Sequence, residues 1–267
     1  MRRRSDNVEL GALLFLVGAA VGAYGTLIGA GGGFLLMPLL LALFPLDRVA
    51  ALTSLSLSVV ALNAGSGSVA YATQRRIDYR LALTLALVTV PASALGALAT
   101  QFISRRAFEA VFGTTLLVVG AILVHRPAPT LRQRVQAAGV QEPRNERFPL
   151  GLALSAAVGW LAGLLGIGGA PPQVVVLTHV MHIPASRAMP TVQFLVLLSA
   201  LGAIGVHASI GGFVISPTKL IALGTGALLG AQVGAALSRR LSGPTLIRLL
   251  AGALLLVGVG LIAKALR

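Results

Sequence analysis

The stretch Gly25–Pro38, GTLIGAGGGFLLMP, lies inside an uncharged run that extends from Leu10 to Leu46. Four of its glycines fall within five positions, at 29 and 31–33. Each glycine inside a helix costs about 1 kcal/mol relative to alanine. In lipid, a broken helix is tolerated only where it is buried in protein or lines a cavity, because its free N–H and C=O groups need partners. The stretch therefore predicts a functional break in a membrane helix.

Composition indicates that the whole chain belongs in a membrane. Of its 267 residues, 56% are hydrophobic and 10% are charged, whereas soluble domains carry about 25% charged residues. We therefore predict an all-α, polytopic integral membrane protein. The absence of cysteine excludes disulfides, thiolate nucleophiles and cysteine metal sites. The arginines at 2–4 and the apolar residues after them resemble a signal peptide, but apolar segments continue to the end, so we interpret them as a retained first span.

The net charge of +14 raises the alternative of a nucleic-acid-binding protein. The basic residues are not clustered, however; they separate the hydrophobic runs, and aromatic residues make up only 5% of the chain. This distribution is typical of residues that orient membrane spans. We expect a lipid bilayer around the protein and no nucleic-acid partner.

Charged residues delimit the predicted spans, each of which needs about 20 apolar residues. The segment 126–147, RPAPTLRQRVQAAGVQEPRNER, is polar and contains prolines. We predict that it is a linker between an N-terminal transmembrane repeat, 1–125, and a C-terminal transmembrane repeat, 148–267. The uncharged runs lie at 10–46, 49–74, 81–104, 149–186, 188–218 and 220–238, with a shorter one at 249–263.

The two halves of the chain resemble each other, which predicts an internal duplication. LIGAGGGFLL at 27–36 matches LLGIGGAPPQ at 164–173, an offset of 137 residues. AALTS at 50–54 matches AMPTV at 188–192, and farther on VAYATQRRID lies opposite VHASIGGFVI. Each half is predicted to contain about four spans plus one short broken or re-entrant helix.

The short helices, Phe34–Phe44 and Pro171–His182, reach only about 18 Å. They are either re-entrant, which gives four spans per half, or tilted crossings, which give five. With the N-terminus inside, four spans per half place 14 of the 21 basic residues inside, and five place only 9. This count favours eight spans and parallel repeats. The protein would then lie in the inner membrane, with both termini and the linker on the cytoplasmic side. Ten spans would instead make the repeats inverted.

The glycine breaks are the predicted binding site. After each break a short helix begins, at Phe34 or Pro171, and its N-terminus carries partial positive charge. Proline is well suited to a first helical turn because its missing N–H would be unpaired there anyway. Two such ends converging near the midplane would bind a small anion. The predicted substrate-binding residues are Gly31, Gly32, Gly33, Phe34, Thr53, Ser54, Gly168, Gly169, Ala170, Gln173, Thr191 and Gln193.

Hydroxyl and amide side chains complete this prediction. Thr53 and Ser54 in the first half, and Thr191 and Gln193 in the second, follow the short helices. They could donate to an oxyanion without trapping it by a full charge, or the hydroxyls could instead bond back to their own helix. Asn63 is a further candidate.

Few residues suit other chemistry. No Asp or Glu lies inside a predicted span, which argues against metal and cation transport and against acid–base hydrolysis. We therefore predict no metal site, no cofactor and no enzymatic activity. Arg48 and Arg187 are candidates for gating or for attracting the anion, or they are interfacial side chains. His179, His182 and His207 share no metal-ligand spacing with a carboxylate, which leaves packing or proton coupling as their roles.

The segments GAGGGFLLMPLL and GLLGIGGAPPQVVVL, each followed by an Ala-x-x-Thr element, give the chain a resemblance to a known family. It resembles the TauE/SafE sulfite exporter-like membrane permeases of the toluene sulfonate uptake permease superfamily. The resemblance covers about residues 10–125 and 148–265. It implies movement of sulfur-containing oxyanions, such as sulfite, sulfoacetate or other organosulfonates, across the cytoplasmic membrane without ATP.

The second half departs from the family pattern. Ala170, Pro171 and Pro172 stand where a third glycine and an apolar residue are usual, and Val192 replaces a serine. Unequal half-sites favour an asymmetric ligand. We expect a secondary transporter of a small sulfur oxyanion, working in export, with a proton as the expected coupling ion. A carboxylate or other small anion as substrate, a non-transporting membrane subunit and a homodimeric assembly remain open alternatives.

Overall fold

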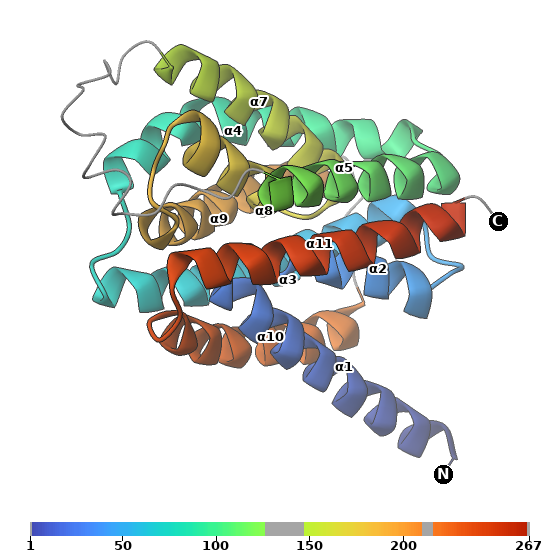
Figure 1. Cartoon of the computed structure of the whole chain (residues 1–267). Coiled ribbons are helices and arrows are strands. Elements are labelled where there is room, and N and C mark those ends of the chain that lie inside the picture. The colour runs from blue at the N-terminus through green and yellow to red at the C-terminus, as the bar shows by residue number, and fades with distance from the viewer. Residues whose placement is uncertain (1, 126–146, 210–215, 266–267) are drawn as a thin grey trace.

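The computed structural model describes residues 2–125, 147–209 and 216–265, with side chains from Glu9 onward (Figure 1). Every regular element in these ranges is helical, which confirms the all-α prediction. Within them, 8 helices are long and apolar enough to cross a membrane, four in each half. These are α1 (Arg2–Leu27), α3 (Val49–Thr73), α4 (Tyr79–Ala99), α5 (Arg105–His125), α7 (Phe148–Leu165), α9 (Ala185–Ser209), α10 (Pro217–Ser238) and α11 (Gly243–Ala265).

Each half also contains the short helix that the sequence predicts. In the first half it is α2 (Gly33–Leu43). In the second half it is α8 (Ala170–Val175), continued by a π-helical turn, η2 (Val176–Val180). A short 3-10 turn, η1 (Thr100–Phe102), connects α4 to α5.

Helices at equivalent positions of the two halves run in opposite directions. The start of α5 lies beside the end of α11: Arg106 Nε donates to the Ala265 carbonyl at 2.8 Å, and Lys264 Nζ lies 3.1 Å from Glu109 Oε1. Toward the other end, Gly120 of α5 faces the earlier residue Leu254 of α11. The two helices are therefore antiparallel, as Figure 1 also shows.

The same reversal holds for α3 and α9, which follow the short helices. Their central residues, Val60 and Val196, lie at one level, where both contact Gly31. The residues after the end of α3 then meet the start of α9, where the backbone N–H of Asp78 donates to Thr191 Oγ1 at 3.1 Å. The repeats are thus inverted.

The inverted arrangement corrects the expectation of parallel repeats. In Figure 1, α2 runs back toward the face from which α1 entered, so each half ends on the face opposite its start. The ends that flank 126–146 therefore lie opposite the termini, and we call these two sides the linker face and the terminal face. By connectivity, the basic residues of the described ranges divide evenly, with 8 at the terminal face and 8 at the linker face. The positive-inside count gave the wrong orientation because it uses only the number of basic residues in the loops, which carries no information about the direction of α2.

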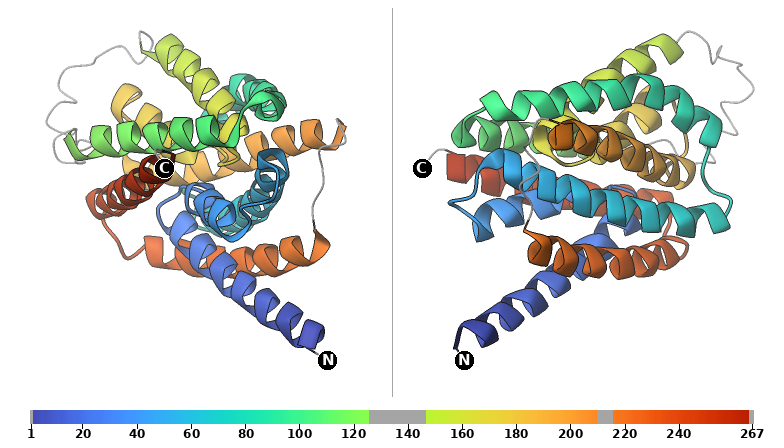
Figure 2. Two further views of the ribbon diagram at one scale, coloured as in Figure 1. Left: turned by 90° about the vertical axis from the view of Figure 1, so that its right-hand side faces the viewer. Right: turned by 180° about the vertical axis from the view of Figure 1, so that it is seen from behind.

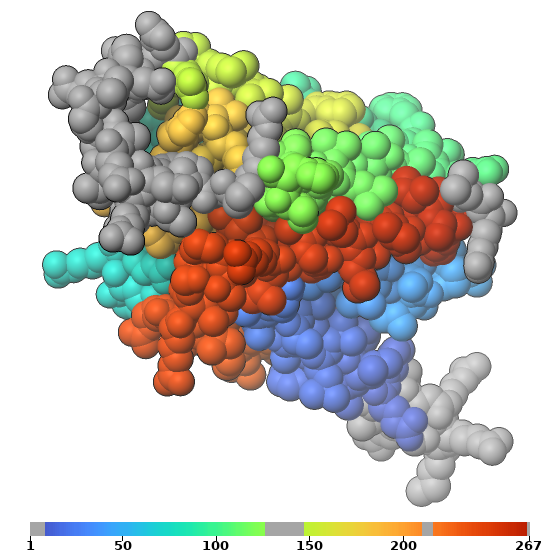
Figure 3. Space-filling view, viewed as in Figure 1, coloured from blue at the N-terminus to red at the C-terminus, as the bar shows by residue number. Residues whose placement is uncertain are grey.

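The two repeats interlock rather than pack side by side. The first helix of each repeat lies along the fourth helix of the other, α1 on α10 and α7 on α4. Glycines make these contacts close: a Cβ at Gly230 would lie 2.1 Å from the Ala19 carbonyl oxygen, and one at Gly163 would lie 1.8 Å from that of Ser93. Small residues allow membrane helices to approach this closely. Figure 2 shows the interlocked helices from two further directions, and Figure 3 shows α11 lying between α5 and α1 on one face.

The inverted arrangement predicts opposite locations for the linker and the C-terminus. A topology reporter inserted within 126–146 and the same reporter fused after Arg267 should give opposite signals, because the flanking helix ends lie on opposite faces. Alkaline phosphatase and fluorescent-protein fusions, measured in parallel, would check this. Equal signals from both positions would contradict the inverted fold.

Glycine packing predicts a stability difference between two matched substitutions. Gly230→Val should lower the Tm by about 5 °C, because the valine side chain would clash with the backbone at Ala19 of the neighbouring helix. Gly252→Val is the control, since a Cβ at Gly252 meets nothing within 4 Å. Thermal unfolding of both variants in the same detergent tests the difference, and equal Tm values would argue against the α1–α10 contact.

Candidate functional site

The two glycine breaks have the same backbone conformation. In the first, Gly29, Gly31 and Gly32 have φ values of 65°, 65° and 76°. In the second, the glycines at 166, 168 and 169 have values of 68°, 72° and 76°. Left-handed backbone of this kind strongly favours glycine, which lacks a Cβ. The glycines therefore allow the chain to reverse inside the bundle.

The two breaks meet at the middle of the molecule. A Cβ placed on Gly31 or on Gly168 would lie within 3.7 Å of a γ-methyl group of both Val60 and Val196, which are near the midpoints of α3 and α9. A Cβ on Gly33 would lie only 2.7 Å from the backbone of Ile167. The structure thus brings together two groups of predicted site residues at mid-depth, Gly31–Gly33 with Phe34 and Gly168–Ala170. We call this contact the crossing.

Both short helices begin at the crossing, but they present different numbers of donors in their first turn. Gly32, the N-cap of α2, has no side-chain capping bond. Among the described residues, the N–H groups of Gly33 and Phe34 donate no hydrogen bond. The equivalent first turn of α8 contains Pro171 and Pro172, which have no N–H to give. The half-sites are chemically unequal, as the departure from the repeat pattern predicts.

A buried amide network holds the first break. The backbone N–H of Gly31 donates to Gln193 Oε1 at 3.1 Å, and Gln193 Nε2 donates to Thr26 Oγ1 at 3.2 Å. Thr26 in turn donates to Asn63 Oδ1 at 3.2 Å. Asn63 Nδ2 is buried and has no partner among the described residues. The network joins α1, α3 and α9, and leaves one amide donor without a partner beside the first break.

Sequence reasoning placed Gln193 in the site and missed Thr26. The only signal for Thr26 was a hydroxyl inside an apolar span just before the glycines. The equivalent position in the second half is Gly163, so comparison of the repeats could not have revealed it.

A small cavity lies beside the second break. Its volume is about 10 Å³, enough for roughly one water molecule. Gln173 lines it together with Gly168 and Gly169; its Nε2 donates to Ser155 Oγ at 2.7 Å, and its Oε1 has no partner among the described residues. The residues of the crossing, 31–34 and 168–170, are all buried, so the crossing is closed in this conformation.

Thr53 lies against the second break, where a Cβ on Gly166 would be 2.3 Å from Thr53 Cγ2, but the predicted hydroxyl groups bond within their own helices. Thr53 and Ser54 donate to the carbonyls of Val49 and Ala50 in their own helix. Thr191 donates to the Arg187 carbonyl and accepts from the Asp78 backbone. For these three the structure favours the alternative considered from the sequence, in which the hydroxyl bonds back to its own helix.

Arg48 and Arg187 lie at opposite faces of the bundle. Arg48 lines a cavity of about 1050 Å³ at the terminal face, which we call the vestibule. Arg105, Lys219 and Asp47 also line it, and Lys219 Nζ lies 2.8 Å from Asp47 Oδ2. Arg187 is exposed at the linker face. Arg105 is itself paired with Glu109, whose Oε1 lies 3.3 Å from Arg105 Nε, so among the described residues the positive balance of the lining comes from Arg48.

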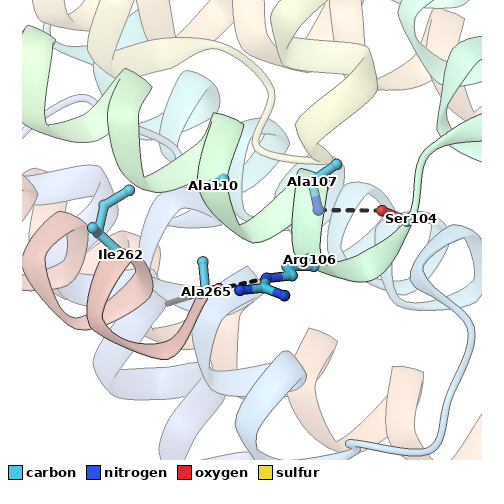
Figure 4. Close-up of a pocket in the computed structure, with 6 residues that line it drawn as sticks. All are labelled: Ser104, Arg106, Ala107, Ala110, Ile262 and Ala265. Atoms are coloured by element: carbon cyan, nitrogen blue, oxygen red, sulfur yellow. Dashed lines mark hydrogen bonds between the residues drawn. The ribbon is translucent and has the colours of Figure 1, made fainter. Parts of the chain in front are cut away.

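A second surface hollow, of about 420 Å³, lies between the start of α5 and the end of α11 (Figure 4). Arg106, Ala110, Ile262 and Ala265 contribute to its lining. It is far from the crossing, because it lies where these two helices reach the terminal face. Within the described ranges, no group of three or more His, Asp or Glu residues could hold a metal ion.

Known proteins match this chain over almost its entire length. The family described as "Sulfite exporter TauE/SafE" matches residues 14–261. The "Probable membrane transporter protein YunE" of Bacillus subtilis is 27% identical over 94% of this chain and 96% of its own length. The "Probable membrane transporter protein MJ0441" of Methanocaldococcus jannaschii is 28% identical over 71% of this chain and 69% of its own. No solved structure matches.

The amide network predicts that Gln193→Leu destabilises the protein. Leucine would leave the Gly31 N–H without its acceptor and Thr26 without its donor, and each buried unpaired group costs about 1–3 kcal/mol. Thermal unfolding should show a lower Tm, whereas the control Gln101→Leu, at an exposed side chain, should leave the Tm unchanged. A Gln193→Leu protein as stable as the parent would show that the network contributes little.

Proposed function

The chain belongs to the sulfite exporter TauE/SafE family, and from that premise we propose that it is a secondary transporter of sulfur-containing oxyanions. The protein is a multi-pass membrane transporter and not an enzyme. The proposed cargo is sulfite, sulfoacetate or another organosulfonate, exported across the cytoplasmic membrane. The family description and the names of the relatives support the transporter class, and the cargo and direction are our proposal.

The observation that carries this proposal is the pair of short-helix N-termini at the crossing. Backbone N–H groups and helix dipoles at such ends favour anions, and transporters use broken helices at the bilayer midplane in this way. The free N–H groups of Gly33 and Phe34 and the unpaired amide of Asn63 supply donors to oxygen atoms. Because none of these groups carries a full charge, an oxyanion bound there could also be released.

The vestibule supports an anionic cargo independently. Arg48, Arg105 and Lys219 line it; Lys219 pairs with Asp47 and Arg105 with Glu109, so among the described residues the charge of Arg48 is left uncompensated. Cavities lined mainly by one sign of charge raise the local concentration of the opposite ion. Anions would therefore gather at the terminal face, while the closed crossing must rearrange to admit one. An ion gradient, with protons the expected coupling ion, would drive that cycle.

Flux in proteoliposomes tests the proposal directly. Sulfite, a small sulfonate, acetate and chloride would be offered in parallel, and saturable movement of sulfite or the sulfonate is expected. Gly33→Val should reduce this flux at least about tenfold, because its side chain would push into Ile167 and separate the breaks. Gly252→Val serves as the matched control, because its position is open.

Two outcomes would contradict the proposal. If no sulfur oxyanion moves while folding and orientation are verified, the substrate assignment is wrong. If sulfite moves equally well in Gly33→Val, the crossing is not the site. Gln193→Leu provides a second site variant should Gly33→Val fail to fold, and it is expected to reduce the flux as well.

A further inference from the structure

Equivalent segments of the two repeats have different exposure. Ala50 and Ala51 line the vestibule and are partly exposed. Their counterparts in the second repeat, Ala188 and Met189, are 0% and 1% exposed. Because the repeats are inverted, the first pair belongs to the terminal face and the second to the linker face. The same structural element is thus open at one face and closed at the other.

Arg76 connects the two repeats at the closed face. It follows α3, and its Nη1 donates to Ser238 Oγ at 3.2 Å and to Gln74 Oε1 at 3.2 Å. Its Nη2 donates to the Ser186 carbonyl at 3.1 Å. Ser238 ends α10 and Ser186 begins α9, so one guanidinium connects the first repeat to two helices of the second. Arginine suits this position because its planar group donates in several directions at once.

The Arg76 contacts continue to the crossing. The guanidinium lies over the ring of Tyr71, 5.4 Å from its centroid, and the Tyr71 hydroxyl donates to the Thr26 carbonyl. The Thr26 hydroxyl accepts from Gln193, which in turn accepts from the Gly31 N–H. A continuous series of contacts therefore links the linker face to the first glycine break. Any movement of that break would strain the contacts that Arg76 makes.

We propose that Arg76 is a latch that keeps the linker face closed, and that this structure is the conformation open to the terminal face. The inference rests on the proposed transport function, because a latch matters only if the two faces open in turn. When Arg76 releases Ser186 and Ser238, the inverted repeats can exchange conformations. The segment at Ala188 and Met189 would then become exposed beside Arg187, while the segment at Ala50 becomes buried.

Cysteine labelling tests the latch, and the natural chain contains no cysteine to interfere. Ala50→Cys and Ala188→Cys would each be combined with Arg76→Gln, and the rate of maleimide labelling measured in nanodiscs without substrate. Arg76→Gln should speed labelling at 188 about three- to tenfold and slow it at 50, because losing charge-assisted bonds shifts the population of the two conformations. Arg76→Lys, which keeps the charge but not the planar group, should give a smaller shift.

Arg75→Gln is the matched control, because Arg75 is the neighbouring arginine and its side chain makes no hydrogen bond or ion pair to a described residue. It should leave both labelling rates unchanged. Equal rates in Arg76→Gln and Arg75→Gln would overturn the latch, and so would faster labelling at both 50 and 188, which indicates general loosening. The labelling needs no cargo, so a failed sulfite assay with reciprocal labelling would reject the proposed substrate and keep the latch.

Discussion

The burial of two broken backbones against each other is the constraint around which the rest of this protein is arranged. Peptide groups that leave a helix at mid-depth cannot turn to water, so they must be enclosed by protein. Ile28, Ala30 and Ile167, which flank the glycines, are each 0% exposed. The two central helices, α3 and α9, supply Val60 and Val196 as the walls of that enclosure. Each repeat therefore needs the other to bury its own break.

Interlocking follows from the same need. α1 and α7 contain the residues that lead into the breaks, and each is held along its length by a helix of the other repeat. Backbone-to-backbone contact at Gly230 and Gly163 leaves little freedom for those pairs to slide. Beyond the glycine breaks, which also make close backbone contacts, the parts with fewer such contacts are the later turns of the short helices and the loops at the two faces. Rearrangement between faces would therefore be concentrated there, with the paired helices moving as units.

The features predicted correctly from the sequence are those set by local residues. The breaks, the short helices and the number of long spans depend on glycine, proline and uncharged length, all of which can be read directly. Helix direction could not be read in this way, because it depends on the face to which α2 returns, and the charge count favoured the wrong alternative.

The hydroxyls of Thr53 and Thr191 were ambiguous for another reason. A serine or threonine near the start of a helix can bond to a ligand or back to its own helix, and only the surrounding structure decides between them. The interlocking of the repeats and the role of Thr26 arise from contacts between distant segments, which a single sequence does not reveal.

Pro171 and Pro172 make the two halves energetically distinguishable. An inverted duplex of identical halves would have two conformations of equal free energy, related by the two-fold axis between the repeats and each populated half of the time. With two amide donors missing from one half only, that degeneracy is lifted, and under the proposed alternation of the two faces the unloaded protein would favour one conformation. A sequence change on a single helix thereby gives a nearly symmetric machine a resting orientation, before any cargo or gradient acts on it.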